Sequence, residues 1–207
     1  DRGTKVKVFE GEPREMLQKH GPDKFYKVIV VESYKLPVIE VHKELLTKEA
    51  LELLMSKVQE DGIVAFHTSN RYYQLPPIIA GAANELKLAC IVGNDRVSRG
   101  DYRFSSEWMM VARDVKHLAR FKNDKTNDID WHPARHQAIK DGKPVETDIG
   151  KEFLWTDKGE QSFRGLYRSD PQIDKLYEAL ADVETFVVNN GVPAESVCKV
   201  SQPIRAG

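Results

Sequence analysis

Carboxylate, imidazole and hydroxyl side chains follow two apolar segments that both have the pattern of buried strands. Glu32 comes directly after the apolar run 28–31, and His67 and Ser69 come directly after the run 63–66. In an open α/β sheet, ligands bind at the edge where the carboxyl ends of the parallel strands meet. A carboxylate at this edge could accept a proton from an amine or bind a cationic polyamine. Glu32 is therefore the candidate catalytic residue, and the plainer interpretation is a solvated acid at a strand end.

Further polar side chains in the loops beyond these two segments are candidates for binding a substrate: His42, Asn70, Arg71 and Tyr72. His42 follows a loop that Pro37 interrupts, so it could belong to a lid, or it could satisfy backbone groups locally. Arg71 and Tyr72 could line a pocket or pack the loop, and Asn70 could cap the helix that follows. The sequence leaves both interpretations of each residue open.

A second group of polar side chains has the spacing of a metal-binding motif. His132 and His136 form a His-x-x-x-His pair, which on a helix would present both rings on one face. Pro133 lies between them and no third ligand is well placed, so we expect a surface segment and no metal. The sequence also contains no Walker phosphate loop, no His-Glu-x-x-His and no Gly-x-Ser-x-Gly, which weighs against these common enzyme classes.

The elements that must position these residues alternate between strand and helix. A strand at 26–32 is followed by a helix that Thr47 caps, by a turn at Asp61-Gly62 and by a strand at 63–66. Pro76 and Pro77 open the next helix, and a short strand follows at 89–92. This alternation predicts an α/β fold with a mostly parallel sheet.

The remaining segments predict additions to this core. Residues 6–9 have the pattern of a strand, and a short helix that Pro13 opens follows it. The segment 108–112 predicts a strand antiparallel to its neighbour, because little chain intervenes that could form a crossover helix. Residues 115–152 are polar and poorly periodic, which predicts a lid, an arm or a partly ordered insertion. The apolar stripe of 173–183 predicts a C-terminal helix that docks on the domain.

These patterns divide the chain into a partial α/β domain at 1–114, a polar insertion or arm at 115–152 and a C-terminal segment at 153–207.

The 207 residues include 31 basic and 32 acidic side chains, so the net charge of -1 gives no reason to expect nucleic acid as a partner. No apolar run approaches the ~20 residues of a membrane span. Cys90 and Cys198 are expected to be buried free thiols in a reducing compartment, so we expect a cytoplasmic protein.

A series of motifs along the first domain resembles one family. The motifs are Glu32, Tyr34, Val41-His42, Leu45-Leu46-Thr47, Asp61-Gly62 and the His-x-Ser-Asn-Arg-Tyr run 67–72. In this order they resemble the spermidine synthase-like family of the S-adenosylmethionine-dependent methyltransferase superfamily, in particular a branch often fused to membrane-transporter-like segments. Two shorter likenesses extend the resemblance: Gly11-Glu12 with Arg14 and Leu17, and the Trp-Thr-Asp run 155–157.

The resemblance implies a Rossmann-like fold, a small-molecule amine as substrate, and S-adenosylmethionine or decarboxylated S-adenosylmethionine as cofactor. Glu32 would orient or deprotonate the amine. Glu12 would accept a hydrogen bond from the adenine amino group, or it is simply an acid favoured at a helix N-terminus. Ser33 and Tyr34 would lie on the cofactor side of the same edge.

The chain also departs from the family pattern. Gly-x-Gly occurs nowhere in it, although the family opens its domain on a glycine-rich turn. The family's strand order is three-two-one-four-five-seven-six, and strands one and two have no counterpart between 6–9 and 28–31. The chain could be the C-terminal part of a longer protein, the flanking strands could pair directly, or another chain could fill the gap. We therefore expect a homo-oligomer, and two functions stay open: an aminopropyl- or methyltransferase, or a non-catalytic scaffold for binding or assembly.

Overall fold

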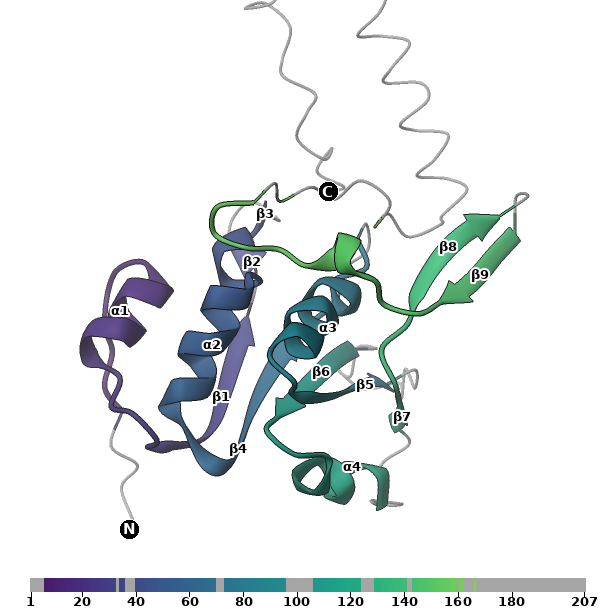
Figure 1. Ribbon diagram of the computed structural model, residues 1–207. Coiled ribbons are helices and arrows are strands. Elements are labelled where there is room, and N and C mark those ends of the chain that lie inside the picture. The colour runs from purple at the N-terminus through teal and green to yellow at the C-terminus, as the bar shows by residue number, and fades with distance from the viewer. Residues whose placement is uncertain are drawn as a thin grey trace, which may run out of the picture.

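Five strands form one open sheet, and two helices cover one of its faces (Figure 1). The computed structural model describes residues 6–32, 34–35, 40–69, 73–95, 106–123, 129–140, 143–159, 161 and 166. The strands are β1 (Tyr26–Glu32), β4 (Val58–His67), β6 (Ser106–Ala112), β5 (Ala89–Asp95) and β7 (Ile129–His132), in this spatial order. β1, β4 and β5 run in one direction, and β6 and β7 run in the other.

The predicted central pair of parallel strands is confirmed. β1 and β4 lie side by side and parallel, with Val28 opposite Ile63 and Val31 opposite Phe66. The start of β4 differs from the prediction, because the chain passes from the preceding helix directly into the strand. Tyr26 pairs with Val58 but Val28 already pairs with Ile63, so β4 contains extra residues, and Asp61-Gly62 lies in this irregularity and not in a turn before the strand.

Helices α2 (Lys48–Lys57) and α3 (Pro76–Glu85) begin where the sequence predicts. The Thr47 hydroxyl accepts a hydrogen bond from the Ala50 amide and caps α2, and Pro76 occupies the first turn of α3. Their buried side chains meet one face of the sheet in the main core, together with Val64, Phe66 and Met109. A smaller cluster on the opposite face joins strand residues to the short helices η2 (Val115–Leu118) and α4 (Ala119–Asn123).

The strand at 106–112 is antiparallel to its neighbours, as predicted, and it lies between β4 and β5. The segment 115–152, predicted as an excursion, contributes to the fold. Its residues 129–132 form β7, which pairs with β5 and adds a second antiparallel strand to the sheet. A hairpin of β8 (His136–Lys140) and β9 (Lys143–Thr147) follows, and η3 (Lys151–Phe153) then leads into the buried Trp155.

The predicted strand at 6–9 is wrong. Residues 6–10, all of them described, lie outside any strand, and the side chains of Val6 and Val8 are 78% and 79% exposed. Val and Phe favour strands only where their side chains pack against a neighbouring strand or a core, and the side chains of Val6 and Val8 do neither. In the described part of the chain, β1 therefore pairs with a strand on the β4 side alone.

The remaining elements lie around this frame. Helix α1 (Pro13–His20) lies beside α2 at the β1 end of the sheet (Figure 1), and the two-stranded ribbon of β2 (Tyr34–Lys35) and β3 (Glu40–Val41) leads to η1 (Lys43–Leu45). No helix among the described residues is long and apolar enough to cross a membrane. The predicted C-terminal helix at 173–183 and Cys198 lie outside the described residues.

Candidate functional site

Three polar side chains form a hydrogen-bonded chain at the carboxyl ends of β1 and β4. Glu32 and His67 are register partners on adjacent parallel strands, so their side chains leave the same face of the sheet. His67 Nδ1 lies 2.7 Å from Glu32 Oε2, and His67 Nε2 lies 2.8 Å from Ser69 Oγ. The His67 ring also stacks on Trp108, with centroids 4.7 Å apart. The imidazole is therefore held at both nitrogens and on one face.

The antiparallel strand β6 holds the far end of this chain in place. The Glu107 amide donates to Ser69 Oγ at 2.7 Å, and the Thr68 amide donates to the Glu107 carbonyl at 2.9 Å. A neutral His67 ring that carries its proton on Nδ1 satisfies these contacts: Ser69 donates to Nε2, and Nδ1–H donates to Glu32. In this state the Glu32 carboxylate is ionised and oriented, and it can accept a proton.

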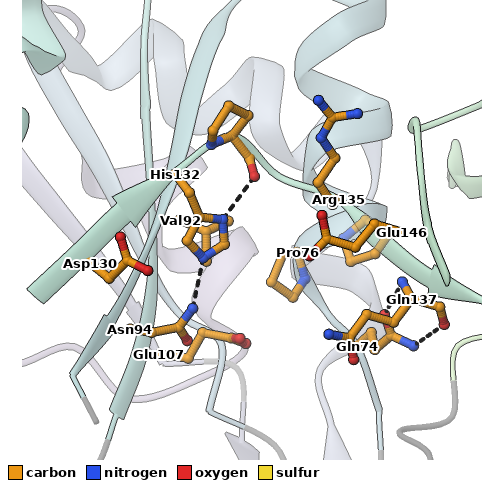
Figure 2. A pocket seen from close by; sticks show the side chains of 12 residues that line it. Gln74, Pro76, Val92, Asn94, Glu107, Asp130, His132, Arg135, Gln137 and Glu146 are labelled. Atoms are coloured by element: carbon orange, nitrogen blue, oxygen red, sulfur yellow. Dashed lines mark hydrogen bonds between the residues drawn. The ribbon is translucent and has the colours of Figure 1, made fainter. Parts of the chain in front are cut away.

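A polar cavity of about 610 Å³ lies at the same end of the sheet, on the face that α3 covers (Figure 2). The Glu107 side chain lines this cavity, whereas the Glu107 backbone amide contacts Ser69. The cavity walls come from the start of α3, the ends of β5, β6 and β7, and the β8–β9 hairpin. Among the described lining residues, Glu107, Asp130 and Glu146 carry carboxylates and Arg135, which contacts Asp148, carries a guanidinium. The volume lies within the ~300–1,000 Å³ of small-molecule sites, and the excess of carboxylates suits a cation.

Two hydrogen-bond pairs give this cavity fixed walls (Figure 2). His132 Nδ1 lies 2.9 Å from the Pro133 carbonyl, and its Nε2 lies 2.8 Å from Asn94 Nδ2. A neutral ring with its proton on Nδ1 satisfies both contacts. On the opposite wall, the Gln74 amide group exchanges hydrogen bonds of 2.9 and 2.8 Å with the backbone of Gln137, which ties the hairpin to the start of α3.

The paired histidines of the sequence do not converge on one site. His132 lies in the wall of the polar cavity, whereas His136 is buried against Phe153, with ring centroids 4.5 Å apart, and its Nδ1 lies 3.2 Å from Thr147 Oγ1. The two residues lie on β7 and β8 and not on one helix, so the helical face on which a shared metal would depend does not form.

Two of the predicted ligand-binding residues meet in another place. Glu12, His42 and Glu44 bring one potential ligand atom each to within 4.8 Å of one another, and His42 Nδ1 lies 2.5 Å from Glu44 Oε1. Ser33, Asn70, Arg71 and Tyr72 lie outside the described residues, and Tyr34 is described only as backbone, in β2. The structure therefore joins Glu32 to His67 and joins Glu12 to His42.

The two short motifs of the family resemblance also converge, which the sequence did not indicate. Asp157 accepts bonds of 2.7 and 2.6 Å from both terminal nitrogens of Arg14, and a bond of 2.7 Å from the Thr47 hydroxyl. The Arg14 guanidinium lowers the pKa of the Asp157 carboxyl, and Asp157 in turn raises the pKa of Arg14. Because Asp157 also lies close to the cap of α2, this junction connects α1, α2 and the C-terminal segment.

The residues near β1 do not form a complete holder for an S-adenosyl group. A cavity of about 210 Å³ lies between α1, α2 and β1, with Arg14 and Glu32 among its lining residues. This volume is below the ~300 Å³ typical of sites for ligands of that size. The sequence also offers no Gly-x-Gly turn that could cradle the group. The described residues thus place polar groups near such a site and supply no cradle.

Fold and site together define a mixed α/β protein with a histidine-supported carboxylate at the carboxyl edge of its sheet. No protein-family model matches the sequence, and no curated protein is significantly similar to it. What the chain does must therefore be inferred from the site.

Proposed function

We propose that this chain is a spermidine synthase-like aminopropyl- or methyltransferase domain that acts on an amine, with Glu32 as the group that takes the amine proton. The observation that carries the proposal is the hydrogen-bonded chain Glu32–His67–Ser69 at the carboxyl edge. This is the position at which an open α/β sheet presents its ligands. The order β1-β4-β6-β5 adds support, because it matches the four-five-seven-six half of the family's strand order.

The geometry suggests how a proton is handled. A protonated amine donates hydrogen bonds to carboxylates, and it must lose a proton before its nitrogen can act as a nucleophile. Glu32 is half exposed, so one side of its carboxylate can meet solvent or substrate while Oε2 contacts His67. The imidazole holds the carboxylate in one orientation. When Glu32 takes up a proton, His67 no longer faces an anion.

The polar cavity supports a cationic substrate. Its described lining residues carry more carboxylates than cationic groups, and the Glu107 backbone bonds to Ser69 of the hydrogen-bonded chain. An amine held by Glu107 and Asp130 would lie at the same end of the sheet as Glu32 but on the opposite face, because Glu107 alternates along β6 with Trp108, on which His67 stacks. The cavity therefore supports the charge of the ligand and not its contact with Glu32. The S-adenosyl-type donor that the resemblance implies is not held by the described residues, so the role we assign to them is binding and deprotonation of the amine.

The alternative function, a non-catalytic scaffold for binding or assembly, is favoured by two observations. The chain has no Gly-x-Gly turn, and the cavity beside β1 is small. Within the described residues no strand pairs with the outer side of β1, which supports the proposal that the protein is a homo-oligomer, because an unpaired apolar strand edge recruits partners. A two-fold axis would bring two such edges together.

Calorimetric titration with putrescine, a small aliphatic diamine, and separately with S-adenosylmethionine and its decarboxylated form, tests the proposal. We expect the diamine to bind, and Glu32→Gln to weaken this binding at least tenfold because the ammonium loses its anionic partner. Glu52→Gln, an exposed acid on α2, is the matched control and should bind as the parent chain does.

The outcomes separate the two functions. Diamine binding that Glu32→Gln leaves unchanged would contradict the assigned role of Glu32. Absence of binding by the diamine and by both sulfonium compounds would favour the scaffold. Micromolar binding of either sulfonium compound would exclude the non-catalytic alternative and would show that the small cavity opens.

A further inference from the structure

We propose that Glu12, His42 and Glu44 form a binding site for a divalent transition-metal ion of the Zn²⁺ type. One potential ligand atom from each residue lies within 4.8 Å of the other two. The three come from two segments that are distant in the sequence: Glu12 directly precedes α1, and His42 and Glu44 lie at the start of η1. This site is separate from the hydrogen-bonded chain of Glu32, and it does not rest on the proposed transferase function.

Each of the two segments has a defined local geometry, and a contact that does not involve the ligand atoms joins them. The Leu45 side chain of η1 is buried, and its amide donates to the His42 carbonyl at 3.0 Å, so the η1 turn is well defined. On the other segment, the Glu12 carbonyl accepts the Met16 amide at 3.0 Å in the first turn of α1. Arg14 Nη1 lies 3.4 Å from the Glu44 carbonyl and connects the segments.

The charges of this cluster favour a cation. Two carboxylates face one imidazole, so the three side chains carry a net charge of −2 with a neutral ring and −1 with a protonated ring. The guanidinium of Arg14, which lies 3.4 Å from the Glu44 carbonyl, donates through both terminal nitrogens to Asp157. Carboxylates close to one another raise the energy of the doubly ionised state, and a bound cation relieves this repulsion.

The donor set indicates which cation. One imidazole nitrogen with two carboxylate oxygens is a mixed set that suits Zn²⁺ and its neighbours, whereas Mg²⁺ prefers oxygen ligands alone and near-octahedral geometry. Bonds of ~2.0–2.2 Å in a tetrahedral site place the donors about 3.5 Å apart. The two Glu side chains can close the remaining distance by rotation. Three protein ligands leave the fourth position to water or to another ligand.

The surroundings suggest what such an ion would do. The His42 side chain is only 12% exposed, and its contact with Glu44 already orients the ring. All eight residues of α1 are described and none of them is buried, so packing alone holds this helix weakly. A metal bridging Glu12 to His42 would fasten the start of α1 to η1. The ion would also bind the Glu12 carboxylate, which the family resemblance implies as the hydrogen-bond acceptor for adenine.

Calorimetric titration of the chain with Zn²⁺, and with Mg²⁺ as the oxygen-preferring comparison, tests the inference. We expect one Zn²⁺ ion per chain and at least tenfold weaker Mg²⁺ binding. His42→Gln and Glu12→Gln should each weaken Zn²⁺ binding at least tenfold. The double variant His132→Gln, His136→Gln is the matched control, because it removes two other histidines, and it should bind as the parent does.

Cobalt supplies a readout that does not depend on affinity. Co²⁺ in place of Zn²⁺ should give visible absorption bands of a four- or five-coordinate site, and these should be lost in His42→Gln. Circular dichroism verifies that each variant is folded. No Zn²⁺ binding at 100 μM, which is about a hundredfold above a micromolar dissociation constant, would overturn the inference. Binding lost in the His132, His136 double variant but kept in His42→Gln would overturn it as well.

Discussion

Replacement of Asp157 by alanine should loosen the attachment of the C-terminal segment to α1 and α2. The Asp157 carboxylate accepts two hydrogen bonds from Arg14 and one from Thr47. The side chains of Arg14 and Asp157 are 25% and 38% exposed, so solvent screens their ion pair, and we assign it about 0.5 kcal/mol. The Thr47 residue is fully buried, and loss of its charged acceptor costs about 1.5 kcal/mol.

The sum predicts that Asp157→Ala lowers the free energy of unfolding by about 2 kcal/mol. For a chain of this length, that corresponds to a fall of about 4–8 °C in melting temperature. Asp157→Asn should lose less, about 0.5–1 kcal/mol, because the amide oxygen can still accept the Thr47 hydroxyl. Asp148→Ala is the matched control: Asp148 also contacts an arginine, Arg135, but its side chain is 92% exposed, and we expect little change.

The pH dependence gives a second test of the same reasoning. Arg14 lowers the pKa of the folded Asp157 carboxyl below its ordinary value. The group therefore stabilises the fold fully above the unfolded pKa of about 3.9, and this contribution is lost as the pH falls through the lower folded pKa. The stability difference between the parent and Asp157→Ala should be constant from pH 7 to about 5 and should shrink in acid.

Urea unfolding of the parent, Asp157→Ala, Arg14→Ala and the double variant measures the coupling directly. We expect the effects of the two single changes to be non-additive, because they remove the same ion pair. A loss below about 0.5 kcal/mol for Asp157→Ala at pH 7, or fully additive effects, would refute the assignment of Asp157 as the junction.

Three further predictions concern other parts of the sheet. Burial raises the pKa of the Cys90 thiol to about 11. In a variant whose other cysteine is replaced by serine, the Cys90 thiol of the folded protein should therefore react with Ellman's reagent at pH 8 far more slowly than that of the unfolded protein. Equal reaction rates would contradict the burial of Cys90. Gly93→Ala would place a Cβ 2.6 Å from the Trp131 ring, so we expect a loss of about 1–3 kcal/mol and altered tryptophan fluorescence, and an unperturbed variant would contradict this packing. Val30, which is 61% exposed on β1, should be close to the interface if the protein dimerises through this strand. Light scattering should then report a dimer for the parent chain and a monomer for Val30→Lys. A monomeric parent chain would contradict dimerisation through β1.

The parts of the fold that the sequence predicts well are those with local signals. The apolar run after Tyr26 and the cap at Thr47 predict the positions of β1 and α2, because strand propensity and helix capping depend on a few neighbouring residues. The burial expected of both faces of β1 is wrong, since Val28 and Val30 are 48% and 61% exposed. The strand predicted at 6–9 fails for the complementary reason: Val6 and Val8 favour a strand, but no partner strand is present in the described structure. The position of β6 between β4 and β5 is a non-local property that no single segment encodes.

The candidate site follows the same rule. Glu32 was identified because it follows an apolar strand, and His67 was noted at the end of the next strand without a role; the parallel register brings the two into contact. Glu107 and Asp130 were missed, since they lie at the start of β6 and on β7, whose strand neighbours are distant in the sequence. A weak signal existed for Glu107, which directly precedes the predicted strand at 108–112. Nothing in the spacing of Glu12 and His42 indicates that they meet.

The place of β6 in the sheet has a consequence for the order in which the protein can assemble. β5 leaves the ribosome before β6, yet it has no sheet contact with β4 until β6 enters between them. Until residue 112 has been synthesised, both flanking strands expose unpaired backbone groups, which are prone to wrong pairing. A nascent chain that ends near residue 95 should therefore remain protease-sensitive, and one extended past β6 and its η2 contacts should gain protection in a single step.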